Sequence, residues 1–176
     1  HRGAARPHPS QRGGAAAEQL GRAIHEARQR GEVGVLTLAA AQIDAQRARM
    51  PGESAEPTLG LVYITDHYAA QAEALYAALR TRWPGVAWAG TVGIGVCAGG
   101  VEYFDEPALV LLLASLPREQ FRVFSGAMPL AGFEAFSALV HADPSTPDLG
   151  ELLLEMSQRT SSGYLFGGLA ASRNGL

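Results

Sequence analysis

A glycine-rich stretch between Trp88 and Glu102 constrains the fold of this chain more than any other feature. It reads WAGTVGIGVCAGGVE and follows an apolar run that is typical of a strand. Glycine accepts positive φ angles and lets one backbone approach another closely. The spacing therefore suits either a loop that wraps a ligand or a tight turn between two strands, and the residues alone are compatible with both.

The glycine stretch does not match a dinucleotide-binding fingerprint. Its segment GIGVCAG has the wrong glycine spacing, and the residues that follow it are extended and apolar rather than helical. The helix whose N-terminus would bind a pyrophosphate is therefore missing. We expect no dinucleotide, and no other cofactor.

Composition and charge indicate a folded domain with no nucleic-acid partner. Hydrophobic residues make up 47% of the chain and charged residues 18%, and the formal net charge is -3. The basic excess lies in residues 1–14, HRGAARPHPSQRGG, which we expect to be a flexible lead-in. No aromatic residue is interleaved with these arginines, as it would be in a segment that stacks on nucleic-acid bases.

The cysteine count, the apolar runs and the two chain ends predict where the protein lies in the cell and whether the domain is complete. Cys97 is the single cysteine, which fits a reducing cytoplasm, and no run approaches the ~20 apolar residues of a membrane helix. We therefore expect a cytoplasmic chain without a membrane partner. Because the chain starts with His1 and ends at FGGLAASRNGL, we expect the domain to be incomplete at its C-terminal end.

Periodicity predicts a single α/β domain over residues 15–176, with a mixed β-sheet, a parallel β-α-β start and flanking helices. Strands are expected at Leu59–Thr65, Val86–Thr91, Val101–Phe104, Ala108–Leu116 and Phe121–Phe124, and helices at Ala15–Arg30, Leu38–Met50, Tyr68–Trp83, Pro129–His141 and Pro147–Gln158. A short strand over Val33–Leu38 is an alternative reading near the start. The turn Asp105–Pro107 predicts a hairpin between the strands on either side of it.

Two acidic residues are candidate ligand contacts. Asp66 follows a strand and precedes a helix, at the edge where α/β proteins usually place their ligands. Its carboxylate could bind a ligand ammonium group or cap the helix. Glu102 follows two glycines at a strand start, where it could face a pocket or lie on the exposed side of the strand.

Five further residues are expected to form the rim of the same pocket. Thr91, Gly93 and Gly95 belong to the glycine stretch. Gly167 and Gly168 follow an apolar segment near the end of the chain, and their N–H groups could form an anion-binding nest. The alternative for this pair is a close-packed crossing of two strands.

The residues do not favour catalysis or metal binding. Cys97 has no base or positive charge near it in sequence, and Ser162 lacks an identifiable partner. His67 and His141 are far apart, and no local spacing supports a metal site. We therefore expect no catalytic residues and no metal ligands, and an activity based on Cys97 or Ser162 is the alternative.

Three blocks in this order resemble the N-terminal region of the FIST family, the domain named for F-box and intracellular signal transduction proteins. They are LGLVYITDHY with its helix, VAWAGTVGIGVCAGGVEYFDEPALVLLLASLP at 86–117 and YLFGGLAASRNGL at 164–176. The resemblance covers about residues 58–176. Its motifs are glycine and apolar patterns rather than chemical signatures, so the ordered set carries the resemblance.

The resemblance implies a small-ligand sensory domain of a signal transduction protein, with amino acids as suggested ligands. It also implies partners outside this chain, either a C-terminal FIST region or a signalling domain. The alternative function is a protein–protein interaction module without a metabolite ligand.

Overall fold

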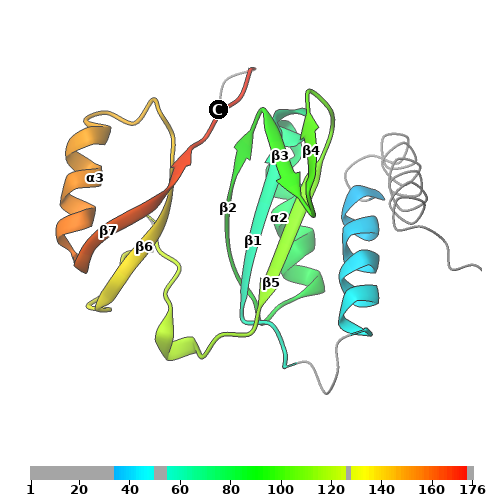
Figure 1. Ribbon diagram of the computed structural model, residues 1–176, viewed down its shortest axis with the longest axis horizontal. Helices are drawn as coiled ribbons and strands as arrows, with labels where there is room; N and C mark the ends of the chain where they lie inside the picture. Colours follow the sequence, from blue (N-terminus) through cyan, green and yellow to red (C-terminus); the bar gives the residue numbers. More distant parts are fainter. Residues whose placement is uncertain (1–33, 50–54, 126–127, 174–176) are drawn as a thin grey trace, which may run out of the picture.

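The computed structural model describes residues 34–49, 55–125 and 128–173. After a helix over residues 34–47, the elements are β1 (Leu59–Thr65), the 3-10 helix η1 (Asp66–Gln71), α2 (Ala72–Arg82), β2 (Ala87–Gly93), β3 (Gly95–Ala98), β4 (Val101–Phe104), β5 (Leu109–Ala114), the 3-10 helix η2 (Arg118–Gln120), β6 (Ala135–Ala142), α3 (Leu149–Gln158) and β7 (Thr160–Leu169). Figure 1 shows α3, β6 and β7 on one side, the β1-β2-β5 sheet in the middle and the helix over residues 34–47 on the other side. The fold is α/β, as the sequence predicts.

The central sheet has the strand order β2-β1-β5. β1 and β2 are parallel, with Leu59 opposite Ala87 and Thr65 opposite Gly93, and η1 and α2 connect them. β5 pairs antiparallel with the other edge of β1. The predicted parallel β-α-β start and mixed sheet are both confirmed.

The hydrophobic core lies between this sheet and α2. Leu75 and Leu79 of α2 are almost fully buried, and Trp83 and Trp88 pack with ring centroids 5.8 Å apart. The helix over residues 34–47 adds Val35 to the same cluster. Because side chains on a strand alternate between faces, a single face of each strand meets this core.

The glycine-rich stretch forms two strands and a turn. Gly90 and Gly93 belong to β2 and Gly95 begins β3, while Gly99 and Gly100 have positive φ angles in the turn before β4. A Cβ atom on Gly90 would lie 1.8 Å from the carbonyl oxygen of Val62, so the close approach of β1 and β2 requires glycine there. The turn between two strands is therefore present at Gly99 and Gly100.

The predicted hairpin across residues 105–107 is wrong. β4 pairs antiparallel with β3, and β5 pairs with β1. The apolar strand β5 extends along nearly all of β1, from Leu109 to Ala114, which gives it a longer ladder than the four residues of β4 could provide. Long-range pairing thus overrides the local turn.

Two predictions in the second half of the chain are also wrong. The helix expected at Pro129–His141 is replaced by the strand β6, which pairs in parallel with β7. The strand expected at Phe121–Phe124 is irregular. The helix expected at Pro147–Gln158 is present as α3, so β6, α3 and β7 form a second parallel β-α-β unit.

At the start of the described chain, the helix begins at residue 34, so the alternative strand over Val33–Leu38 is wrong. The helix expected at Ala15–Arg30 and the lead-in over residues 1–14 lie outside the described residues. Within the part of the chain that is described, no helix has the length and apolar character to cross a membrane.

Contacts between described residues join the second unit to the central sheet. The Ala171 N–H donates to the carbonyl of Val92 on β2 at 3.1 Å. The phenol of Tyr63 on β1 and Nε2 of His141 on β6 are 3.1 Å apart. Another contact is an ion pair at the end of β1, which forms the site described next.

Candidate functional site

The site lies at the carboxyl ends of the parallel strands β1 and β2. Thr65 is the last residue of β1 and is fully buried. Its hydroxyl donates to the carbonyl of Glu106 at 2.9 Å and accepts from the N–H of Ala108 at 2.9 Å. These bonds fix the turn between β4 and β5 against the end of β1, where Asp66 follows.

Asp66 is a buried carboxylate that binds an arginine from the far end of the chain. Arg173 Nη2 lies 2.7 Å from Oδ1 of Asp66, and Arg173 Nε lies 2.9 Å from Oδ2. The backbone N–H of Arg173 donates to the same Oδ2 at 2.9 Å. Such a two-pronged guanidinium–carboxylate pair is stronger and more directional than a single charged hydrogen bond.

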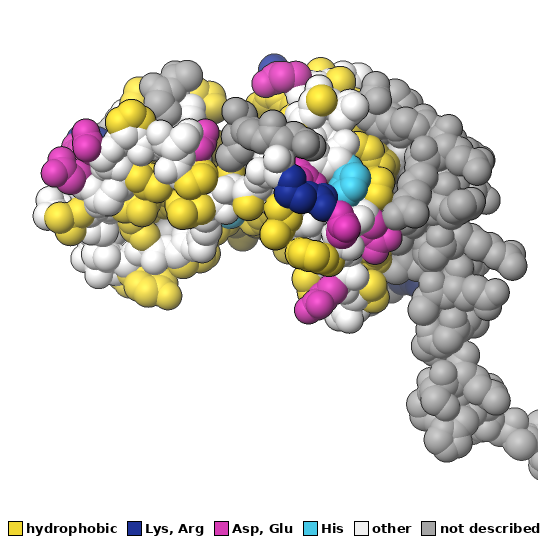
Figure 2. Space-filling model, turned by 90° about the horizontal axis from the view of Figure 1, so that it is seen from above, with side chains coloured by type: hydrophobic (Ala, Val, Ile, Leu, Met, Phe, Trp, Pro, Cys, Tyr) yellow, Lys and Arg dark blue, Asp and Glu magenta, His cyan; other side chains and the backbone are white. Residues whose placement is uncertain are grey.

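Two more ionisable side chains complete the cluster. Arg173 Nη1 also donates to Oδ1 of Asp105, in the turn after β4. The ring Nδ1 of His67 lies 3.5 Å from Oδ1 of Asp66. We call Asp66, His67, Asp105 and Arg173 the edge cluster. Figure 2 shows basic, acidic and histidine side chains gathered together on the face seen from above.

Mutual pairing sets the protonation states of the edge cluster. Hydrogen bonds from Arg173 lower the pKa of Asp66 far below its usual value, and they lower the pKa of Asp105. The same bonds raise the pKa of Arg173. The two carboxylates and the one guanidinium together carry one net negative charge, which favours a ligand with a positive group.

Asp66 does not cap the helix that follows it. The N-cap position of η1 is Thr65, and no side-chain hydrogen bond caps that helix. The carboxylate of Asp66 turns to Arg173 instead. The capping interpretation is therefore wrong, while a contact between Asp66 and a ligand stays a prediction.

The other predicted residues lie at several places near this edge. Gly93 ends β2 opposite Thr65, beside Asp66, and Gly95 begins β3. Thr91 is half-buried on β2. Glu102 is exposed on β4, opposite Cys97.

The two late glycines lie in the strand β7. A Cβ atom on Gly167 would lie 1.9 Å from the carbonyl oxygen of Val140, so this position is a close approach of two strands. Gly168 has open space around it. The hydrogen bond between Ala171 and Val92 draws the end of β7 to the end of β2. Gly168 and Gly93 therefore belong to strands that converge at this edge.

Sequence reasoning missed Arg173 and Asp105. Arg173 follows Asp66 by 107 positions, and no local pattern in SRNGL marks it as the partner of a buried carboxylate. One general signal was available, because a buried aspartate at a strand end needs a cation and lysine is missing from the chain. The cation therefore had to be an arginine or a histidine.

A second polar contact, between half-buried side chains, lies between the two units. His141 and Tyr63 meet edge to face, with ring centroids 5.3 Å apart. Burial lowers the pKa of His141, and its Nδ1 is buried without a hydrogen-bond partner in the described structure. Among the described residues, no group of three or more His, Cys, Asp or Glu side chains is arranged to hold a metal ion.

Comparison with family models decides the relationship of this chain to known proteins. The model of the FIST N domain matches residues 58–176. The chain belongs to the FIST N domain family. Membership supports, in general terms, a sensory domain in signal transduction. The match begins just before β1 and includes every residue of the edge cluster, while no curated protein and no solved structure matches the chain at a significant level.

Proposed function

We propose that this FIST N domain is a cytoplasmic sensory domain that binds a small ligand at the edge cluster. The observation that carries the proposal is the convergence of Asp66, Asp105 and Arg173, from three distant segments, at the carboxyl ends of two parallel strands. Open α/β sheets commonly bind ligands at this edge.

The charges suggest a ligand with both an ammonium and a carboxylate group, such as an amino acid. The guanidinium of Arg173 has the planar donor geometry that binds a carboxylate. The exposed carboxylate of Asp105 would accept a hydrogen bond from an ammonium group, while Asp66 would attract the ammonium through its charge and hold Arg173 in position. Arg173 is partly exposed, so a ligand could reach its outer side from solvent.

Gly93 and Gly168 would supply backbone at the rim of the pocket. Both lie on strands that end near the edge cluster, where a glycine leaves room for a ligand to approach the main chain. A bound ligand would then contact β1, β2 and the segment after β7 together. Binding would favour one position of the second unit relative to the first. A C-terminal FIST region or a signalling domain in contact with the second unit would respond to that change.

The proposal includes no catalytic step. Cys97 is exposed on β3. The hydroxyl of Ser162 donates to the carbonyl of Phe136 at 2.5 Å and accepts from the N–H of Tyr164 at 3.1 Å. Both of these bonds are to the backbone, so neither activates the serine as a nucleophile.

Thermal unfolding against a panel of amino acids, short organic acids and nucleotides tests the proposal. A ligand that binds only the folded state raises the unfolding midpoint. We expect a selective rise with one or a few amino acids. A flat response across the panel, together with a cooperative transition, would contradict ligand binding by this chain.

A protein–protein interaction module is the second candidate, and exposed aromatic residues favour it. Tyr164 and Phe166 on β7 are 63% and 48% exposed and stack with ring centroids 6.1 Å apart, and Phe136 on β6 is 74% exposed. Exposed apolar groups of this kind often mark partner surfaces. A flat thermal response with loss of partner binding in Phe166→Ser would favour this candidate.

A further inference from the structure

A separate cavity of about 170 Å³ lies on the far side of β5 from β1. One wall is the helix over residues 34–47, and the other is formed by β3, β4 and β5. Figure 1 shows this helix standing alongside β5 and the β3–β4 hairpin. None of the four edge-cluster residues lines the cavity.

The helix presents an apolar stripe to the cavity with two amides in it. Leu38 and Ile43 supply apolar surface, and Gln42 and Gln46 follow at helical spacing. Residues four apart lie on one face of a helix, so the two amides point the same way. In the described structure neither glutamine side chain has a hydrogen-bond partner.

The opposite wall includes the unpaired edge of β5. Thr65 N–H donates to the carbonyl of Ala108 at 3.0 Å, so in this antiparallel ladder alternate residues from Ala108 onward direct their backbone toward β1. Leu109 and Leu111 lie between them and direct their N–H and C=O groups outward. Among the described strands, β5 is the last of its sheet on this side.

Besides the two glutamines and the backbone of β5, Tyr103 on β4 adds a polar group to the cavity wall. Its side chain is half-buried, and burial is the main cause that raises the pKa of its phenol. The phenol therefore stays protonated and can both donate and accept a hydrogen bond. Among the described residues, no arginine, histidine, aspartate or glutamate lines the cavity.

We propose that this cavity binds a small uncharged ligand with an apolar body and a peptide-like amide. The outward backbone groups of Leu109 and Leu111 match the donor and acceptor of an amide, as in strand addition to a sheet edge. A charged ligand would find no counter-ion among the described residues of the wall and would lose its hydration. The volume lies below the ~300–1,000 Å³ typical of sites for drug-sized ligands, so the occupant is small.

This inference is independent of the edge cluster, because it assigns a different site and excludes the zwitterions proposed there. The test uses calorimetric titration of the full chain with N-acetyl-leucine methylamide, in which both charges of leucine are blocked. We expect the capped compound to bind, and we expect free leucine and N-acetyl-leucine to show no binding that responds to changes in the cavity. Methylation of the leucine nitrogen of the probe should weaken its binding several-fold, because it removes a donor to the β5 edge.

Variants in the wall locate the binding. Ala39→Phe fills the cavity and should weaken binding at least about tenfold, while Tyr103→Phe and Gln42→Leu should each weaken it several-fold. Gln158→Leu, at the exposed end of α3, is the matched control and should leave binding unchanged. The unfolding midpoint of each variant, measured beside its affinity, separates loss of the site from loss of the fold.

Three results would overturn the proposal. They are no binding of the capped compound at millimolar concentration, equal affinity in Ala39→Phe with its fold intact, and equal affinity for free leucine with the same response to the wall variants.

Discussion

The two β-α-β units of this chain differ in how they are stabilised. In the first region, residues 34–49 and 55–125, the central sheet and α2 enclose the buried apolar residues, from Val35 to Ala108. In the second region, residues 128–173, Thr160 is the sole buried residue among those described, and α3 has none. The first region carries a core, and the second depends on contacts with its neighbour.

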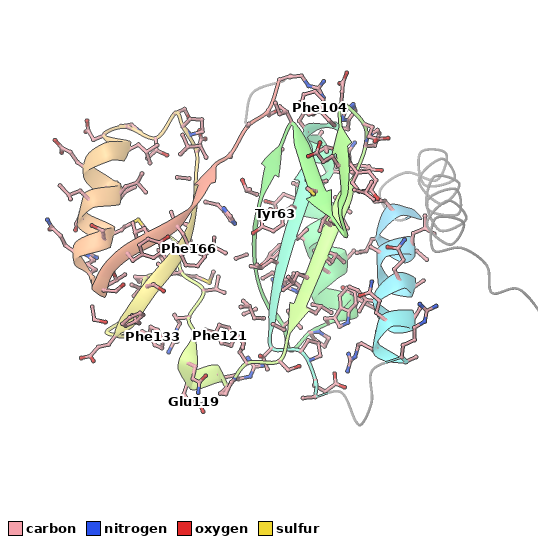
Figure 3. The ribbon with its side chains drawn as sticks, in the orientation of Figure 1. Tyr63, Phe104, Glu119, Phe121, Phe133 and Phe166 are labelled. Atoms are coloured by element: carbon pink, nitrogen blue, oxygen red, sulfur yellow. The ribbon has the colours of Figure 1, made fainter. Side chains whose placement is uncertain are left out.

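Polar contacts tie the second region to the first. Tyr63 meets His141, Ala171 meets Val92, and Arg173 meets Asp66. Figure 3 labels Tyr63 on β1 and Phe166 on β7, which come from the two sheets that these contacts join. A ligand at Asp66 and Arg173 would therefore bind where the first region, which has a buried core, contacts the second region, which has almost none. Binding there could change how the second region is held, as a sensor requires.

The largest effect is expected in the core of the first region. Leu79 is 1% exposed, so Leu79→Ala should lower the free energy of unfolding by about 2–5 kcal/mol through lost burial and a residual cavity. Leu154 on α3 is 60% exposed, and Leu154→Ala should change it by less than about 0.5 kcal/mol. Urea unfolding measures both. Equal losses would show that the second region has a core of its own.

The next effect concerns two adjacent glycines in the second region. Gly167 has a φ angle of 137°, and a Cβ there would lie 1.9 Å from the Val140 carbonyl oxygen, so Gly167→Ala should cost this region at least about 2 kcal/mol. Gly168→Ala meets open space and should change stability by less than about 0.5 kcal/mol. Hydrogen exchange of the β6 and β7 amides measures the loss.

Tryptophan fluorescence reports on unfolding of the first region alone, because Trp83 and Trp88 are the two tryptophans of the chain and both lie in that region. It should report little change for Gly167→Ala. A large fall in the fluorescence-detected midpoint would mean that the two regions unfold as one.

A smaller effect is expected from loss of the ion pair between Arg173 and Asp66, which links the two regions. Arg173→Gln leaves the buried Asp66 without its guanidinium and should reduce the hydrogen-exchange protection of β6 and β7 more than that of β1 and β2. Arg159→Gln removes an exposed pair with Glu155 and is the matched control, expected to have little effect. Equal protection in both variants would contradict a role of Arg173 in holding the second region against the first.

The smallest effect is a dependence on pH in the acid range. The pKa values of Asp66 and Asp105 are lowered in the folded chain, so both carboxylates stabilise the fold fully above their ordinary value of 3.8. That stability is lost as the pH falls below 3.8 and through the lowered folded values. Urea unfolding across this range should show a steeper loss for the native chain than for Arg173→Gln. Parallel curves would contradict the assignment.

The difference between the regions also explains what could be predicted from sequence. β1 and α2 have patterns that their own packing requires, and β1 is predicted to its exact limits. β6 was predicted as a helix because its strand pairing depends on β7, which follows after α3. Local pattern predicts an element well when the element packs on near neighbours.

The candidate site could likewise be predicted only where its residues depend on local sequence. Asp66 could be identified from its place at a strand end, but its partner lies 107 positions away and has no motif. Gly93 and Gly95 are predicted to lie in a loop, and the structure places them in the strands β2 and β3. Charge pairs between distant segments follow from topology, and a local pattern holds no information about them.

Calorimetric titration with the amino acids that raise the unfolding midpoint is the direct test of a ligand site at the edge cluster. The native chain, Arg173→Gln and the control Arg159→Gln would be compared under the same conditions. We expect the native chain and Arg159→Gln to bind. Arg173→Gln should lose at least about tenfold in affinity, because charged hydrogen bonds to the ligand carboxylate are removed. Equal affinity in all three proteins would contradict a ligand site at the edge cluster.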